Sequence, residues 1–110
     1  MNQLTGPGQI GIAGGSSRPR GVTADEPIGI FDSGMGGLTV ARSIVDSLPD
    51  ESVVYFGDTK RCPYGVRKPA EIREFVRQIG SWFMRRRVKV IVIACNTATS
   101  AALPMAQRTF

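Results

Sequence analysis

The sequence predicts an α/β fold of three layers, in which a parallel sheet lies between helices on its two faces. Three short apolar runs are separated by stretches whose apolar residues recur at helical spacing. Each of these runs stops abruptly at a cluster of small polar residues. Alternation of strand and helix is typical of a parallel sheet whose strands are joined by right-handed crossovers.

The apolar pattern places the expected elements along the chain. Strands are expected at residues 28–31, 53–56 and 88–94. The last of these is nearly continuous in β-branched residues, as in a strand that is buried on both faces. Amphipathic helices are expected at residues 38–48 and 72–83, because apolar side chains recur there every three or four positions.

The two ends of the chain are expected to differ from this core. Residues 1–26 hold many glycines and few apolar side chains, which predicts a flexible N-terminal extension. The glycines at 8–15 loosely imitate a phosphate loop, but a linker is the better interpretation because no strand precedes them. Residues 27–110 form a partial α/β domain, in which a helix of small residues begins around 100–103. No fourth strand follows, so the sheet would keep an open edge and the domain looks incomplete.

Composition and charge argue against several classes of protein. The 42% hydrophobic and 21% charged residues are typical of a soluble globular chain. No apolar run approaches the roughly 20 residues of a membrane helix. The start lacks the pattern of a secretory signal, so a cytoplasmic protein with reduced cysteines is expected. The net charge of +5 is concentrated in the N-terminal tail and at residues 85–89. A solvated helix end is favoured there over a nucleic-acid surface.

The absence of histidine restricts the chemistry that the chain can perform. Histidine is the most common general base and metal ligand, so acid–base work must use Cys, Asp, Glu, Lys or Tyr. Two cysteines, Cys62 and Cys95, cannot fill a tetrahedral zinc site by themselves. We therefore expect no metal.

Polar clusters at the three strand ends form the expected functional site. These clusters are Asp32-Ser33, Asp58-Thr59 and Cys95-Asn96-Thr97. The carboxyl ends of parallel strands lie along one rim, and ligands bind in the crevice at that rim. Helix caps are the structural alternative, and that alternative is adequate for Thr59. The glycines that follow Asp32 favour a functional role there.

Cys95 is the residue most expected to react. It follows a buried strand and precedes a helix start, where backbone N–H groups lower the pKa of a thiol from about 8.5. A thiolate at this place serves as a base or a nucleophile, whereas a cysteine after an apolar strand is otherwise inert packing. The polar neighbours Asn96 and Thr97 favour the functional interpretation, and Cys62 is a weaker candidate.

Three motifs resemble those of glutamate racemase, the cofactor-independent enzyme that supplies D-glutamate for bacterial peptidoglycan. They are IGIFDSGMGGLTV at residues 28–40, YFGDTKRCPYG at 55–65 and IACNTATS at 93–100. The resemblance runs from about Pro27 to the end of the chain, and three motifs in this order are more specific than one glycine pattern. It implies the incomplete N-terminal domain of a fold in which two similar α/β domains face each other across the site.

The resemblance also implies roles for individual residues. Cys95 would be one of two thiols that exchange the substrate α-proton from opposite faces. Asp32 would hold the substrate ammonium and assist Cys95. Other residues would bind the carboxylates or close a loop over glutamate, using hydroxyl, amide or backbone N–H donors. They are Ser33, Pro63, Tyr64, Gly65, Asn96 and Thr97. The resemblance implies no cofactor.

The sequence departs from the family in its second thiol. The family places that thiol in a Gly-Cys-Thr-His type segment of its C-terminal half, and these 110 residues hold no such segment. Cys62 is no substitute, because it belongs to the substrate-loop motif. We therefore expect that the 110 residues alone do not racemise glutamate. For the full-length protein the resemblance implies a homodimer, and binding to DNA gyrase follows from family analogy only.

A dinucleotide-binding module of Rossmann type is the alternative. Residues 34–37 contain three glycines between a strand and a helix, and Asp58 could imitate the acid that binds a ribose. Against it, Thr39 replaces the third glycine of the fingerprint, and Asp32 would place negative charge near a pyrophosphate. A non-enzymatic interaction role is a further alternative. Racemases for aspartate and other acids share the Cys-Asn-Thr segment, but the other two motifs favour glutamate.

Overall fold

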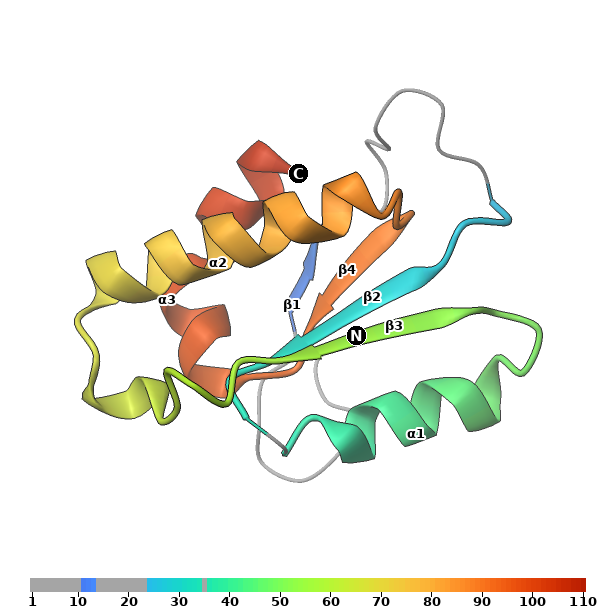
Figure 1. The fold of residues 1–110 in the computed structure, drawn as a ribbon, viewed down its shortest axis with the longest axis horizontal. Helices are drawn as coiled ribbons and strands as arrows, with labels where there is room; N and C mark the ends of the chain where they lie inside the picture. The colour runs from blue at the N-terminus through green and yellow to red at the C-terminus, as the bar shows by residue number, and fades with distance from the viewer. Residues whose placement is uncertain (1–10, 14–23, 35) are drawn as a thin grey trace.

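The computed structural model describes residues 11–13, 24–34 and 36–110, which form one mixed sheet and its covering helices. The strands are β1 (Gly11–Ala13), β2 (Ile28–Asp32), β3 (Val53–Gly57) and β4 (Val90–Ile93). The helices are α1 (Leu38–Ser47), α2 (Pro69–Arg85) and α3 (Asn96–Thr109), and a 3-10 turn, η1, spans Tyr64–Val66. Figure 1 shows these elements with their labels.

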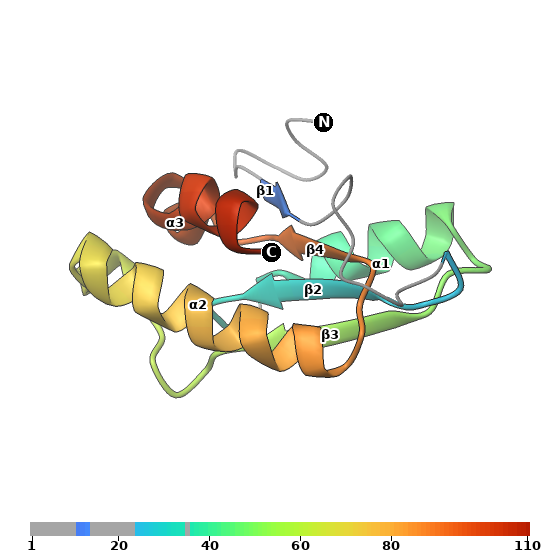
Figure 2. The same cartoon turned by 90° about the horizontal axis from the view of Figure 1, so that it is seen from above.

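Strand β2 is the centre of the parallel part of the sheet. It pairs with β3 on one side and with β4 on the other, and Ile28 lies opposite both Val53 and Val90. The strand order is β1-β4-β2-β3, as Figure 2 shows. The predicted α/β class with a parallel sheet between helices is confirmed.

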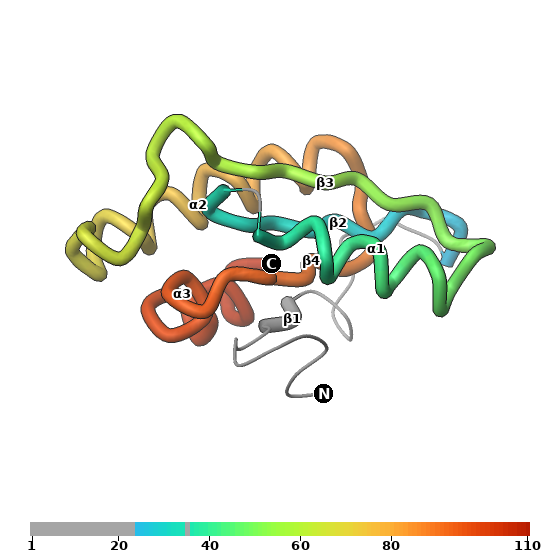
Figure 3. Tube along the Cα trace, turned by 90° about the horizontal axis from the view of Figure 1, so that it is seen from below, coloured from blue at the N-terminus to red at the C-terminus, as the bar shows by residue number. Residues whose placement is uncertain are grey.

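The helices cover the sheet on both faces. Helices α2 and α3 pack on one face, where Phe31, Phe83 and Ile93 belong to the larger apolar core. Helix α1 packs on the other face through Val40 and Ile44. Figure 1 shows α1 on the opposite side of the strands from α2, and Figure 3 shows α1 in front when the molecule is seen from that side. Because side chains alternate along a strand, β2 supplies residues to both cores.

Strand β1 was not expected from the sequence. It pairs antiparallel with β4 within the segment that the sequence predicts to be a flexible extension, and Ile12 lies opposite Val92. The pairing satisfies backbone groups of β4 that a three-stranded sheet would leave at an open edge. The short sequence Gly11–Ala13 has no pattern that predicts a strand. It pairs because the edge of β4 would otherwise be free. Residues 1–10 and 14–23 of the predicted extension lie outside the described residues.

Two helices begin earlier than the sequence predicts. Helix α3 begins at Asn96 and not around residue 100, because the Cys95 side chain caps its first turn by accepting a hydrogen bond from the Ala98 N–H. Helix α2 begins at Pro69, where the missing N–H of proline costs nothing. The Glu71 carboxylate accepts the Lys68 N–H at 3.0 Å and supports this start.

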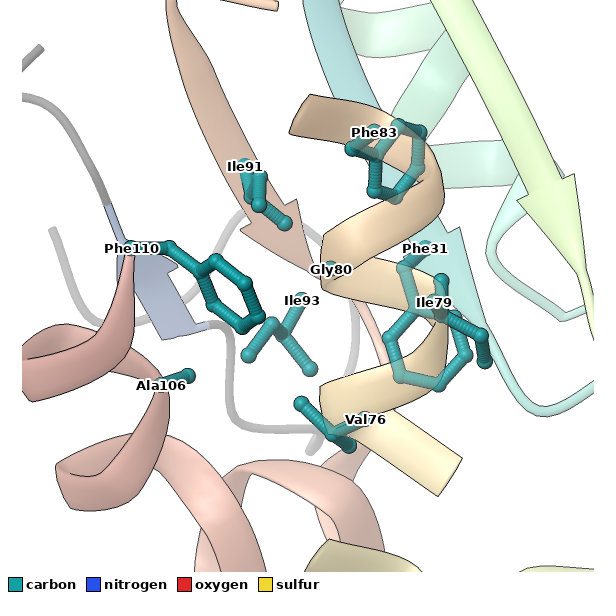
Figure 4. Close-up of a pocket in the computed structure, with 9 residues that line it drawn as sticks. All are labelled: Phe31, Val76, Ile79, Gly80, Phe83, Ile91, Ile93, Ala106 and Phe110. Atoms are coloured by element: carbon teal, nitrogen blue, oxygen red, sulfur yellow. The ribbon is translucent and has the colours of Figure 1, made fainter. Parts of the chain in front are cut away.

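Close packing fills the space between α2, α3 and the sheet. Phe83 lies so near β2 that a Cβ at Gly29 would stand 2.8 Å from its ring, and a Cβ at Gly80 would stand 2.2 Å from the ring of Phe110. The apolar cavity that remains beside Phe110 has a volume of about 10 Å³ (Figure 4). A cavity of this size without polar walls stays empty and holds no ligand.

Candidate active site

The carboxyl ends of the parallel strands bring the predicted polar clusters to one rim. Asp32 ends β2, Asp58 follows β3, and Cys95 lies two residues after β4. Backbone hydrogen bonds extend the strand pairing to these positions, from the Asp58 N–H to the Asp32 carbonyl at 2.9 Å and from the Ala94 N–H to the Phe31 carbonyl at 2.8 Å. The three clusters therefore lie at the carboxyl ends of neighbouring parallel strands.

Cys95 lies at the first turn of α3 and is 7% exposed. Its sulfur is 3.4 Å from the Ala98 nitrogen, whose N–H it accepts, and 3.4 Å from Ser33 Oγ, to which it donates. Although Cys95 belongs to the larger apolar core, its thiol contacts a hydroxyl that follows β2 and a backbone N–H in the first turn of α3. The sulfur is thus an acceptor for one polar group and a donor to another.

Asp32 is 6% exposed and holds the start of α1. Its Oδ2 accepts the N–H of Gly37, the N-cap residue of α1, at 2.6 Å, so the carboxylate caps the start of that helix from outside it. Tyr55 lies close by and donates to the Gly34 carbonyl at 3.1 Å. Burial, and secondarily the negative charge of Asp32, raise the pKa of Tyr55 to about 12. The capping alternative thus describes one real contact of Asp32, while Ser33 is the side chain that meets the thiol.

The loop after β3 buries the side chain of Tyr64. Tyr64 is 1% exposed, and its hydroxyl donates to Asp58 Oδ2 at 2.5 Å. Burial, followed by this hydrogen bond, raises the pKa of the Tyr64 phenol. Pro63 and Gly65 on either side of it are exposed at the surface. The loop therefore buries Tyr64 and leaves the residues on either side of it at the surface.

Cys62 belongs to the same loop and is exposed. Its sulfur lies beside the strand end of β2, because a Cβ built at Gly34 would stand 3.1 Å from it. Gly34 thus leaves the space that lets the loop approach the Asp32-Ser33 segment. A side chain at this position would push the loop away from the rim.

An open groove of about 450 Å³ adjoins the start of α3. Asn96, Thr97 and Ser100 line one wall from α3, and Arg67 and Arg73 line the other. The groove therefore combines amide, hydroxyl and guanidinium donors, which bind carboxylates well. Neither arginine was expected from the sequence, because neither lies in one of the polar clusters at the strand ends. Arg73 directly follows the buried Ile72 in α2. Helical spacing could therefore have predicted that Arg73 lies at the edge of the exposed side of that helix.

Comparisons with known proteins agree with these motifs. No family model matches the chain. Its sequence is 64% identical over 77 residues to a glutamate racemase of Corynebacterium diphtheriae, covering 70% of this chain and 29% of the relative. Its fold matches a crystal structure of glutamate racemase from Thermus thermophilus in complex with β-chloro-D-alanine. That match has a TM-score of 0.75 and 50% identity, and covers 78% of this chain and 34% of the other.

A second solved structure, the Francisella tularensis glutamate racemase in complex with D-glutamate, matches with a TM-score of 0.74 and 43% identity. The match covers 76% of this chain and 32% of that one. This chain is homologous to part of a glutamate racemase. It spans about 29% of the length of two curated racemases that it matches.

The dinucleotide-binding alternative is not favoured beside these racemase relatives. The Asp58 carboxylate, which would have to bind a ribose, already accepts from Tyr64 and from Arg61 at 2.7 Å. Within residues 11–13, 24–34 and 36–110, no group of three His, Cys, Asp or Glu residues is placed to hold a metal ion. In the same ranges, none of the helices has the length and apolar character needed to cross a membrane.

Proposed function

We propose that this chain carries one half of a glutamate racemase site, in which Cys95 is one of the two thiols. The observation that supports this most is the corner between β2 and β4, where the Cys95 sulfur lies 3.4 Å from Ser33 Oγ. Asn96 and Thr97, the two residues that follow Cys95 in the chain, line the open groove. A thiol beside carboxylate-binding donors is what proton exchange at an amino-acid α-carbon requires.

The proposed chemistry is a proton transfer without a cofactor. The Cys95 thiolate takes the α-proton of glutamate, the Cα–H bond breaks, and the electron pair is delocalised into the α-carboxylate. A second thiol returns a proton to the opposite face, which inverts the centre. D-glutamate made in this way would supply peptidoglycan synthesis. Cys62 lies in the substrate loop and is not that second thiol, so these 110 residues alone are expected not to racemise glutamate.

Substrate binding is assigned to groups around the corner. The Ser33 hydroxyl and the donors of Asn96 and Thr97 bind the carboxylates, while the Asp32 carboxylate attracts the ammonium. Pro63, Tyr64 and Gly65 contribute the loop. Because the Tyr64 phenol bonds to Asp58, its part in binding is through the backbone. Residues 27–110 would then be a partial racemase domain and residues 1–26 an extension of it.

Titration of the isotope-labelled chain with D-glutamate tests this proposal. We expect the amide resonances of Ser33, Asn96 and Thr97 to shift together and to saturate. The variant Ser33→Ala should weaken binding by about tenfold, since a lost hydrogen bond to a charged group costs roughly 1.5–3 kcal/mol. Val45→Ala on the exposed side of α1 is the control and should bind as the unaltered chain does. Absence of any saturating shift at these three amides would contradict the proposal.

A further inference from the structure

Asp58 joins the substrate loop to the sheet through one buried carboxylate. Its residue is 6% exposed, and its Oδ2 accepts from the Tyr64 hydroxyl at 2.5 Å and from Arg61 Nε at 2.7 Å. Its backbone N–H donates to the Asp32 carbonyl at 2.9 Å. One residue thus connects the end of β2 with two points of the loop that follows β3.

The loop is also fixed to α2 through Arg61. The Arg61 guanidinium lies 4.0 Å from the ring centroid of Phe75, and its Nη1 donates to Gln78 Oε1 at 2.8 Å. A guanidinium that stacks on an aromatic ring and bonds a buried carboxylate loses its freedom to move. Asp58 therefore meets a partner that is itself held in place.

The closing end of the loop depends on the same contacts. The Arg67 N–H donates to the Tyr64 carbonyl at 2.9 Å, and the Arg67 side chain donates to the Arg61 carbonyl at 3.4 Å. The Tyr64 ring packs among Phe31 and Phe75, with centroids 6.0 and 5.5 Å away. A residue buried this way fixes the backbone on either side of it.

Residues on either side of the buried Tyr64 remain exposed. Cys62, Pro63 and Gly65 are exposed, and no heavy atom lies within 4 Å of a Cβ built at Gly65. The loop therefore buries the Tyr64 side chain and leaves the backbone around Gly65 unobstructed. Such a stretch binds a ligand best when it is held rigid before the ligand arrives.

We propose that Asp58 is a positioning residue, whose carboxylate holds the Arg61–Tyr64 turn so that the Pro63–Gly65 backbone is presented ready-formed to the substrate. This inference rests on the proposed function, because it assumes that the loop contacts glutamate. Asp58 itself touches no substrate in this account and acts through Tyr64 and Arg61. Its loss affects the loop first and the global fold only secondarily.

Hydrogen exchange and ligand titration of Asp58→Asn test the inference. We expect the Arg67 amide to exchange about 10–100-fold faster than in the unaltered chain, relative to amides of β4, since a charged hydrogen bond is weakened. The affinity for D-glutamate should fall by about tenfold or more. Ultraviolet titration should show the Tyr64 phenol ionising at lower pH, because the Asp58 carboxylate contributes to raising its pKa.

Two further variants complete the experiment. Asp46→Asn removes a carboxylate from an exposed ion pair with Arg42 and should match the unaltered chain in every measurement. Should Asp58→Asn fail to fold, Tyr64→Phe keeps the buried ring, removes only the hydroxyl, and should show the same changes to a smaller degree. Unchanged Arg67 exchange, or faster exchange with unchanged D-glutamate affinity, would overturn the inference. If the unaltered chain binds no D-glutamate, the proposed function fails, while the exchange rates still decide whether Asp58 holds the loop.

Discussion

Two helices begin at the rim, and their first turns are capped by very different side chains. Helix α1 is held by a carboxylate, because Asp32 accepts the Gly37 N–H at 2.6 Å. Helix α3 is held by a thiol, because Cys95 accepts the Ala98 N–H at 3.4 Å. Sulfur is a weak acceptor and a carboxylate is a strong one. The difference predicts that Asp32 contributes more to the stability of the fold than Cys95 does.

The largest effect should come from removing the strong cap. Asp32→Ala should lower the free energy of unfolding by about 2–3 kcal/mol, because it leaves the Gly37 N–H without its charged acceptor. Urea denaturation measures this directly. Asp46→Ala, which alters an exposed carboxylate in the body of the same helix, is the matched control and should change stability by less than about 1 kcal/mol. Equal losses from the two variants would remove the contrast between the caps.

A side chain at Gly37 should disturb the same cap from its other side. A Cβ there would stand 2.6 Å from Asp32 Cβ and 3.2 Å from the Tyr55 hydroxyl. Gly37→Ala should therefore lower stability by about 1–3 kcal/mol through overpacking. Gly65→Ala is the control, because its Cβ would meet open space. A stable Gly37→Ala chain with unaltered Asp32 contacts in its structure would contradict this packing.

Sequence reasoning reached the three parallel strands and their polar ends, because apolar runs and the residues that stop them are local features. It placed Asp32 and Cys95 at one rim for the same reason. The inward direction of Tyr64 could not be predicted, because its hydroxyl partner Asp58 is fixed by how the loop folds back. Strand β1 escaped prediction since its pairing depends on the free edge of β4, which lies about 80 positions away in the sequence.

The pH dependence of stability should report on the neighbourhood of Asp32. The pKa of Tyr55 is raised from 10.0 to about 12 in the folded chain. Because the pKa is higher in the folded state, the folded chain holds the Tyr55 proton more tightly than the unfolded chain does. The stability that Tyr55 contributes in this way is present below pH 10 and is lost as pH rises towards 12. Tyr64 acts in the same direction.

Tyr55→Phe isolates the contribution of Tyr55 to this loss. The variant should be less stable by roughly 1 kcal/mol at neutral pH, because the bond to the Gly34 carbonyl is gone. Its stability should also fall less steeply above pH 10 than that of the unaltered chain. Denaturation curves taken below pH 10 and between pH 10 and 12 compare the two. If both chains lose the same stability above pH 10, ionisation of Tyr55 does not cause the loss.

The smallest effect on stability should come from replacing Cys95, the weak cap of α3. Cys95→Ser keeps an acceptor at the start of α3 and should change the free energy of unfolding by less than about 1 kcal/mol. Serine is a far weaker base than a thiolate, so the variant separates the fold from the chemistry. Denaturation measures the stability of the variant, and titration of the same sample with D-glutamate measures its binding. A stability loss as large as that of Asp32→Ala would show that the thiol is mainly structural.

Alkylation of Cys95 in the presence and absence of D-glutamate would show whether the substrate binds at this thiol. Mass spectrometry resolves Cys95 from Cys62, so each thiol has its own rate of reaction with iodoacetamide. We expect D-glutamate to slow the alkylation of Cys95 in proportion to the occupied fraction of the site, and L-alanine, which lacks the second carboxylate, to slow it much less. An unchanged Cys95 rate at D-glutamate concentrations that saturate the amide shifts would place the ligand elsewhere and contradict the account.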